Sequence, residues 1–273
     1  MLVSINGVLS EAAAARIDPA DRGFTLGDGI FESIVVRKNA VRHLGAHLAR
    51  LRRGAEVLGI PLAGDDQHLA GLIGATITAN ALTEAVVRVT LTRGPGARGI
   101  ASPPQPIPTL VISTAPLPPP AEAARVIIAT VTRRNEHSPL SRIKHLNYLD
   151  NILARREAEA AGADDAILLN TAGQVAESTV ANIFLLVDSY MLTPPVEDGA
   201  LPGILRHEAI KLARAEERSV APETLRRASE VFLTSALGVR PVTHIDGRPV
   251  GDGEPGLITQ LLATRLEGKH RQI

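Results

Sequence analysis

The sequence contains one lysine in a setting that suits covalent chemistry, Lys144 in the stretch 142–151. Apolar residues recur at helical spacing after it, at Leu149, Ile152 and Leu153, and a Ser-Pro pair shortly before it is typical of a turn. The pattern therefore predicts that Lys144 lies at the start of a helix. The positive end of a helix dipole and a partly dry pocket both disfavour the ammonium form. A neutral lysine amine can form a Schiff base with a carbonyl compound, although most lysines near helix starts are solvated surface charges.

A second group that could do chemistry is the carboxylate of Glu177. It follows an apolar strand predicted over 166–169 and a turn over 170–173, and it precedes a second strand over 182–187. Glu177 thus falls near the start of the return strand of a hairpin. It is either an exposed carboxylate at a hairpin end, or a carboxylate that faces a pocket, where it requires a cationic partner.

Three short motifs occur along the chain in an order and spacing that are specific enough to compare with known families. They are Lys144–Tyr148 (KHLNY), Glu177–Phe184 (ESTVANIF) and Leu201–Ile204 (LPGI). Together they resemble the class IV aminotransferases, the fold-type IV enzymes of pyridoxal phosphate (PLP). This family includes branched-chain aminotransferases, D-amino-acid transaminases and 4-amino-4-deoxychorismate lyases, and the resemblance covers nearly the whole chain.

The resemblance implies PLP as cofactor and gives roles to particular residues. Lys144 would carry PLP covalently and act as the general base that removes the Cα proton of the substrate. Glu177 would keep the pyridine nitrogen protonated, and Tyr148 would lie beside a cofactor oxygen. The phosphate would be held by Arg50, by the backbone amides of Ile204 and Leu205, and by a hydroxyl of Thr234 or Ser235. The residues alone leave an ordinary polar helix face as the alternative for Arg50.

A basic, glycine-rich loop over 93–99 is the candidate substrate-binding segment. Arginines on such a loop suit bidentate carboxylate recognition, although plain solvent exposure is more common. The loop resembles the corresponding loop of aminodeoxychorismate lyases, whose substrate carries two carboxylates, with Arg98 as first candidate and Arg93 as second. The predicted function is therefore an aminodeoxychorismate lyase, which forms 4-aminobenzoate and pyruvate in the folate pathway. The alternative is an aminotransferase for D-amino acids or branched-chain amino acids.

Three departures from the family pattern leave the reaction open. Leu205 stands where many relatives have threonine, which removes one side-chain contact to the phosphate. The loop over 234–239 is about one residue shorter than usual and lacks an asparagine seen in lyase relatives. Val35 stands where some D-amino-acid transaminases have a basic residue.

The elements that position these residues divide at a proline-rich break over 116–120, which favours an interdomain connection. We expect two domains, 1–117 and 118–273. The resemblance implies a mixed α/β fold of fold type IV, with a small N-terminal α/β domain, a larger C-terminal pseudo-barrel domain, PLP between them, and a homodimer. The sequence predicts a hairpin over 2–9, helices over 44–58, 67–80 and 204–214, strands over 86–92, 109–113 and 231–235, and a hairpin turn over 245–248.

Composition narrows the class of protein. The 273 residues contain 29 Lys and Arg against 29 Asp and Glu, and a net charge of zero argues against nucleic acid as a partner. The chain has no cysteine, hence no disulfide and no thiolate zinc site. His43 and His47 have a metal-ligand spacing but no third ligand nearby, so we expect a surface pair and no metal. Because neither a signal peptide nor a membrane span is evident, we expect a cytoplasmic enzyme whose partner is a small amino-acid or amino-chorismate substrate.

Overall fold

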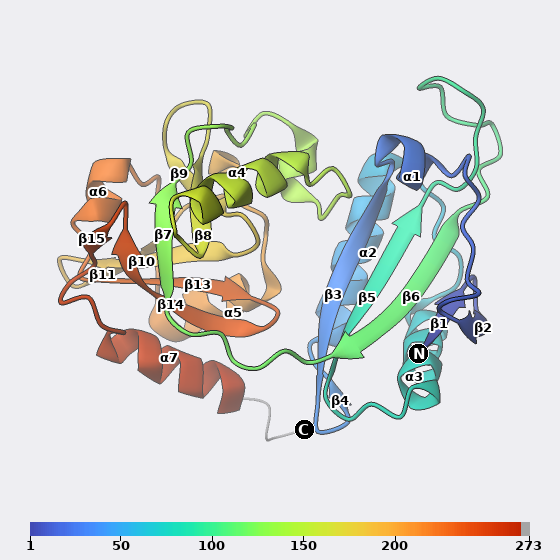
Figure 1. Cartoon of the computed structure of the whole chain (residues 1–273), viewed down its shortest axis with the longest axis horizontal. Helices are drawn as coiled ribbons and strands as arrows, with labels where there is room; N and C mark the ends of the chain where they lie inside the picture. Colours follow the sequence, from blue (N-terminus) through green and yellow to red (C-terminus); the bar gives the residue numbers. More distant parts are fainter. Residues whose placement is uncertain (269–273) are drawn as a thin grey trace. The chain divides into compact units, whose positions relative to one another are not determined.

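The computed structural model describes residues 1–268, which form two compact units (Figure 1). Unit 1 consists of Met1–Pro119 together with Ile143–Asn147, and unit 2 consists of Pro120–Arg142 and the chain from Tyr148 onward. The units change close to the proline-rich break, but a short later segment returns to unit 1. The division into two domains at residue 118, each able to fold on its own, stays a prediction.

Unit 1 is a six-stranded antiparallel sheet in the order β2-β1-β6-β5-β3-β4. Helices α2 and α3 contact the sheet and each other, so they cover the same face (Figure 1). The elements of unit 1 are β1 (Leu2–Ile5), β2 (Val8–Glu11), α1 (Arg22–Leu26), β3 (Gly29–Arg37), β4 (Ala40–Val41), α2 (Leu44–Leu58), α3 (Asp66–Ala79), β5 (Ala85–Thr92) and β6 (Thr109–Pro116).

Local sequence signals explain most of these elements. Asn6 and Gly7 join β1 to β2 with φ angles of 50° and 85°, as a two-residue hairpin requires. Leu48, Leu51 and Ala55 are buried along one face of α2. The predicted hairpin, both helices and the two strands in this part of the chain are therefore confirmed.

Unit 2 is built on a mixed sheet in the order β12-β11-β10-β13-β14-β7-β8-β9, with β15 paired to β14. The end strand β9 also contacts β10, which stands third from the other end of this order, so the sheet curls like part of a barrel. The elements of unit 2 are β7 (Ala124–Ile128), η1 (Pro139–Arg142), α4 (Leu149–Ala160), β8 (Asp165–Leu169), β9 (Val175–Ser178), β10 (Asn182–Val187), β11 (Tyr190–Thr193), η2 (Val196–Asp198), α5 (Ile204–Ala213), β12 (Glu216–Glu217), α6 (Pro222–Arg226), β13 (Glu230–Ser235), β14 (Gly238–Ile245), β15 (Arg248–Pro249) and α7 (Leu257–Gly268).

Strand β10 shows why this part of the sequence is so continuously apolar. Its residues alternate between two cores, because neighbouring side chains of a strand point to opposite faces. Ile183 and Leu185 belong to the core enclosed by the curled sheet, whereas Phe184 belongs to the core that α5 and α7 cover. There Phe184 stacks on Phe232, with ring centroids 5.0 Å apart. The predicted strands, hairpins and helix of this part are confirmed.

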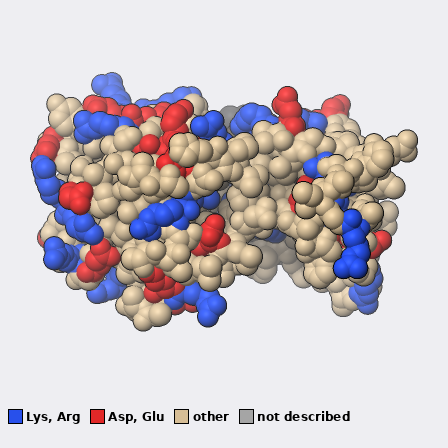
Figure 2. Space-filling model, turned by 90° about the horizontal axis from the view of Figure 1, so that it is seen from above, with Lys and Arg blue, Asp and Glu red and all other residues tan. Residues whose placement is uncertain are grey.

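Two surface properties bear on the class of protein. Within residues 1–268, none of the helices combines the length and the apolar character that crossing a membrane demands. On the face drawn in Figure 2, basic and acidic side chains are intermixed with uncharged ones.

Candidate active site

Lys144 lies on a segment that extends the sheet of unit 1. The backbone N–H of Phe31 in β3 donates to the carbonyl of Lys144 over 2.8 Å. Helix α4 begins only at Leu149, after Tyr148 as its N-cap residue. The prediction that Lys144 lies at a helix start is therefore wrong. Residues before the helix pair with β3 instead, so a strand, and not a helix dipole, positions the lysine.

Lys144 shares an aromatic ring with an arginine that the sequence analysis missed. Its Nζ lies 4.4 Å from the centroid of the Phe31 ring, and Cζ of Arg88 lies 3.7 Å from the same centroid. The amine and the guanidinium are therefore no farther apart than the sum of these two distances. Both contacts are of the cation–π type. Arg88 is exposed, and the available signal was that it is the one charged residue in the apolar strand β5.

The opposite face of β3 carries a buried charged cluster around Glu32. Nε and Nη2 of Arg50 each donate to the Glu32 carboxylate over 2.7 Å, and Nδ1 of His47 lies 2.7 Å from Oε2. Burial raises the pKa of Glu32, but the hydrogen bonds from Arg50 and His47 outweigh it and hold that pKa below its usual range. The predicted surface pair of histidines is wrong for His47, which is buried. Within residues 1–268, no group of His, Cys, Asp and Glu is arranged to hold a metal ion.

Glu177 in β9 is buried and has the cationic partner that a buried carboxylate requires. Nη2 of Arg134 lies 2.9 Å from its Oε1, and the N–H of Leu201 donates to Oε2 over 3.0 Å. The side chain of Asn182 approaches the same oxygen at 3.4 Å. The structure therefore agrees with the interpretation of Glu177 as a carboxylate that is removed from solvent and paired with a cation, and not with an exposed carboxylate at a hairpin end. Sequence reasoning required a cation here but could not identify Arg134, because the two residues meet only through the fold.

A second carboxylate stabilises the loop that presents Arg134. Glu136 accepts hydrogen bonds from the Thr171 hydroxyl and backbone N–H, over 2.7 Å and 3.0 Å. These hydrogen bonds lower the pKa of Glu136 to about 2. In addition, the N–H of Arg134 donates to the carbonyl of Leu169 over 2.8 Å. The loop therefore lies against the β8–β9 hairpin, which brings Arg134 to Glu177.

Asn182 is the centre of the groups that are predicted to hold a phosphate. The Thr234 hydroxyl and the first backbone N–H groups of α5 lie around it. Thr234 is the direct cross-strand neighbour of Asn182, and a Cβ on Gly203 would lie only 2.0 Å from Oδ1 of Asn182. Helix α5 begins directly after Gly203, and this residue provides no side-chain cap, so the first amides of the helix remain available for an anion. The buried Oγ1 of Thr234 has no hydrogen-bond partner among the described residues. These groups fit an anionic ligand such as the PLP phosphate.

The remaining residues of the predicted phosphate site have different surroundings. Leu205 is buried in the core beneath α5 and can offer only its backbone N–H. Ser235 is half-buried at the end of β13. A two-residue connection joins β13 to β14, which accounts for the short loop over 234–239. Tyr148 is half-buried before α4.

The two predicted substrate arginines differ in environment. Arg93 is buried: its guanidinium donates to Asp28 and also to the carbonyls of Leu58 and Gly59 at the end of α2. Arg98 is exposed on the loop between β5 and β6.

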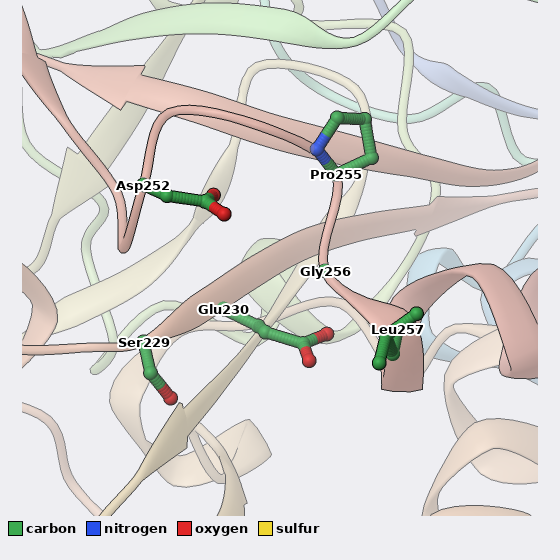
Figure 3. Close-up of a pocket in the computed structure, with 6 residues that line it drawn as sticks. All are labelled: Ser229, Glu230, Asp252, Pro255, Gly256 and Leu257. Carbon is green, nitrogen blue, oxygen red and sulfur yellow. The ribbon is translucent and has the colours of Figure 1, made fainter.

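A separate hollow next to α7 contains no predicted site residue. Two acidic residues line it, and one of them, Glu230, accepts hydrogen bonds from the N–H groups of Ile258 and Thr259 and from the Thr259 hydroxyl, so it caps the helix. In Figure 3 the Glu230 carboxylate accordingly extends toward the start of α7. The lining residues are Ser229, Glu230, Asp252, Pro255, Gly256 and Leu257.

Comparison with known proteins gives one consistent family. Residues 29–245 match the model for the amino-transferase class IV family. A putative branched-chain-amino-acid aminotransferase of Methanocaldococcus jannaschii is 33% identical, over 98% of this chain and 96% of that protein. A D-alanine aminotransferase of Bacillus licheniformis is 31% identical over the same shares. The crystal structure of a putative 4-amino-4-deoxychorismate lyase of Legionella pneumophila superposes with a TM-score of 0.88 at 31% identity, covering 95% of this chain and 97% of that one.

These similarities extend over both units, and they include the segments that carry Lys144, Glu177 and the start of α5. The predicted fold class, with its small α/β part and its larger pseudo-barrel part, is confirmed. The enzymes of this family use PLP, so the predicted enzyme class and cofactor are confirmed as well. The chain belongs to the class IV aminotransferase family.

Proposed function

We propose that this enzyme is an aminotransferase that moves an amino group between an amino acid and a 2-oxo acid. The observation that carries the proposal is the pair of contacts on the Phe31 ring, where the amine of Lys144 and the guanidinium of Arg88 lie on one aromatic side chain. A transaminase requires a base at the Cα proton and a cation for a substrate carboxylate. Lys144 and Arg88 supply these two groups, and each contacts the Phe31 ring.

The chain's own groups account for the requirements of the cofactor. Lys144 forms the covalent attachment, and the carboxylate of Glu177, kept in place by Arg134 and the N–H of Leu201, receives the pyridinium N–H. The amides at the start of α5 and the Thr234 hydroxyl bind the phosphate. When bound, PLP supplies an electron sink for the negative charge that forms at Cα.

Of the other predicted ligands, Ser235 and Tyr148 are half-buried. Ile204 and Leu205 are the residues whose backbone N–H groups bind the phosphate at the start of α5. Arg50 already binds Glu32 with two of its nitrogens, so its part in holding the phosphate rests on the family resemblance.

Substrate recognition is assigned to exposed arginines. Arg88 contacts the same Phe31 ring as the amine of Lys144, and Arg98 extends from the β5–β6 loop as a second guanidinium for a carboxylate. Arg93, the second candidate from the sequence, is not proposed, because Asp28 and two helix-terminal carbonyls already occupy its donors.

The lyase predicted from the sequence is the second candidate. Two exposed arginines also suit a substrate with two carboxylates, and the Legionella structure is named a putative 4-amino-4-deoxychorismate lyase. The names of the relatives by sequence favour transamination, of branched-chain amino acids or of D-alanine.

One experiment tests the cofactor site and the reaction. Borohydride reduction fixes PLP covalently to its lysine, and peptide mapping then locates the attached cofactor. We expect it on the peptide that contains Lys144, and attachment to another peptide would contradict the assignment. The same preparation is assayed with aminodeoxychorismate, and with D-alanine and L-leucine in the presence of 2-oxoglutarate. We expect transamination that falls about tenfold or more in Arg88→Ala, as for loss of a charged hydrogen bond, and is unchanged in Arg53→Ala, an exposed arginine of α2. Release of 4-aminobenzoate without transamination would replace the aminotransferase by the lyase.

The predicted homodimer stays a prediction. Its support in the structure is an apolar stripe on α4, where Leu149, Ile152 and Leu153 are 74%, 52% and 43% exposed. A second copy of the chain would remove this stripe from water. Sedimentation at assay concentration measures the oligomeric state.

A further inference from the structure

The β5–β6 connection is the segment that carries Arg98. It joins two strands that pair directly at Thr92 and Thr109, yet it runs from Arg93 to Pro108 without regular secondary structure. Hairpin connections are usually two to five residues long, and a long irregular one requires side-chain contacts to take a single conformation. Such contacts are present, and most of them come from Asp21 and Arg22.

Asp21 holds the base of this loop. Its Oδ2 accepts hydrogen bonds from the hydroxyls of Thr92 and Thr109, over 2.9 Å and 2.7 Å, so one buried carboxylate joins the two strand ends. Next to it, the N–H of Arg22 donates to the carbonyl of Gly94 over 2.9 Å. The loop therefore leaves the sheet in a fixed direction.

The side chain of Arg22 holds the loop farther out. Nη1 donates to the carbonyls of Gly99 and Ala101 over 3.2 Å and 3.0 Å, and Nη2 donates to the carbonyl of Ile100 over 3.1 Å. One guanidinium thus binds three consecutive carbonyls. Arg22 is only 5% exposed, whereas Ile100 is 88% exposed, so the loop covers the arginine and faces solvent on its other side.

Charge explains why an arginine can be buried here. Its Nε donates to Asp28 over 2.8 Å, and Arg93 donates to the same carboxylate. Burial raises the pKa of Asp28, but the hydrogen bonds from Arg93 and Arg22 outweigh it and hold that pKa below its usual range. Two guanidiniums on one carboxylate leave an excess of positive charge. Loop carbonyls around Arg22, and carbonyls at the negative end of helix α2 around Arg93, compensate for it.

We infer that Arg22 is a positioning residue that sets the conformation of the 94–101 loop and, through it, the place of Arg98. Arg98 lies between two of the fixed points, the N–H of Gly96, which donates to Ala20, and the carbonyl of Gly99, which accepts from Arg22. Its own side chain is exposed, so its place depends on these backbone contacts. The inference rests on the proposed role of Arg98 as a carboxylate ligand.

Two variants of the PLP-loaded enzyme test the inference. Arg22→Lys keeps a charge beside Asp28, but an ammonium cannot bind three carbonyls in one plane. Gly96→Ala keeps the residues Arg22 and Asp28 and places a Cβ 2.9 Å from Cδ of Arg22, so the loop and the Arg22 side chain must move apart. The matched control is Arg16→Lys, an exposed arginine that also donates to backbone carbonyls.

The first readout is trypsin cleavage after Arg98, whose rate follows the opened population of the loop. We expect cleavage at this bond to be at least about tenfold faster in Arg22→Lys and in Gly96→Ala than in the wild type, and unchanged in Arg16→Lys. Equal cleavage rates in Arg22→Lys and the wild type would overturn the inference.

The second readout separates positioning from a merely structural role. With aminodeoxychorismate, D-alanine or L-leucine, whichever the wild type turns over, KM should rise about tenfold in Arg22→Lys while kcat changes less than about threefold. The double variant Arg22→Lys/Arg98→Ala should have the KM of Arg98→Ala, because both changes remove the same contact. A KM in the double variant that is raised by the product of the two single increases would overturn the inference, and so would fast cleavage with an unchanged KM. An unchanged KM in Arg98→Ala would also overturn the inference. In that case the error would lie in the proposed role of Arg98 as a carboxylate ligand, and not in the contacts of Arg22.

Discussion

Replacement of Glu32 by glutamine is the perturbation for which the structure gives the clearest magnitude. The carboxylate is 1% exposed and accepts three hydrogen bonds of 2.7 Å, two from Arg50 and one from His47. Glutamine has the same shape, but it replaces one of the two carboxylate oxygens by an NH2 group. This group is a donor, and it cannot accept a hydrogen bond from the donors of Arg50 or His47. Because Oε2 accepts two of the three bonds, an amide oxygen in its place keeps those two and loses the bond from Nε of Arg50, which costs about 1.5–3 kcal/mol. Because the buried Arg50 guanidinium also loses the negative charge of Glu32, we expect the free energy of unfolding to fall by about 4 kcal/mol.

Urea unfolding followed by far-ultraviolet circular dichroism measures this change. The chain has no tryptophan, and its two tyrosines, Tyr148 and Tyr190, both lie in unit 2, so tyrosine fluorescence provides a second signal from the unit without the substitution. The control is Glu56→Gln, which changes an exposed glutamate of α2 and should alter stability by less than about 0.5 kcal/mol. A loss below about 1 kcal/mol in Glu32→Gln would refute the argument that this ion cluster stabilises unit 1.

The pH dependence of the same variant gives an independent check. The pKa of Glu32 is lower in the folded protein than its ordinary value of 4.5, so ionisation of this carboxylate favours folding. Its contribution is complete above the ordinary pKa and is lost as pH falls through the lowered one. The stability difference between the wild type and Glu32→Gln should therefore be constant between about pH 7 and pH 5 and should shrink on further acidification. A difference that grows with acid would contradict the direction of the shift.

Two further predictions concern unit 2. Thr234→Val removes a buried hydroxyl that has no partner in the described chain, so stability should change by less than about 0.5 kcal/mol; PLP affinity, measured by absorbance titration, should fall about tenfold if that hydroxyl binds the phosphate, and unchanged affinity would remove Thr234 from the site. For Glu136, the pKa of about 2 lies below the ordinary 4.5, so the stability advantage of the wild type over Glu136→Gln should be complete above pH 4.5 and lost as pH falls toward 2. A difference in urea midpoint that persists at the acid end would contradict the hydrogen bonds to Thr171.

Elements with a strong local pattern were predictable from the sequence. The helix predicted over 44–58 coincides with α2, and the hairpin at Asn6-Gly7 is present, because periodicity and turn residues act within a few positions. The fold class followed from the order of motifs. The start of α4 was misplaced relative to Lys144 because the competing interaction, pairing with β3, joins residues more than a hundred positions apart.

The sequence proposed single residues of the candidate site but not their partners. It singled out Glu177 and Lys144, whereas the pairing of Arg134 with Glu177 and the contact of Arg88 with the same Phe31 ring as Lys144 arise only through tertiary contacts. Arg50 was chosen by resemblance, and its partner Glu32 could have been suspected. A lone acid inside an apolar strand must be paired, because an unpaired buried charge costs too much. Arg93 illustrates the converse, since a glycine-rich basic loop gives no sign of which arginine is buried.

The pairing of Lys144 with β3 has a consequence for insertions and deletions. Successive residues of an extended segment point to opposite faces of a sheet, so a shift of register by one residue would turn the lysine from the Phe31 face to the face that holds Glu32. One residue added or removed within this paired segment should thus abolish activity while leaving every functional side chain in the sequence. Length variation among homologous chains should accordingly avoid 143–147 and occur in the exposed connections, where no side chain depends on the parity of the residue count.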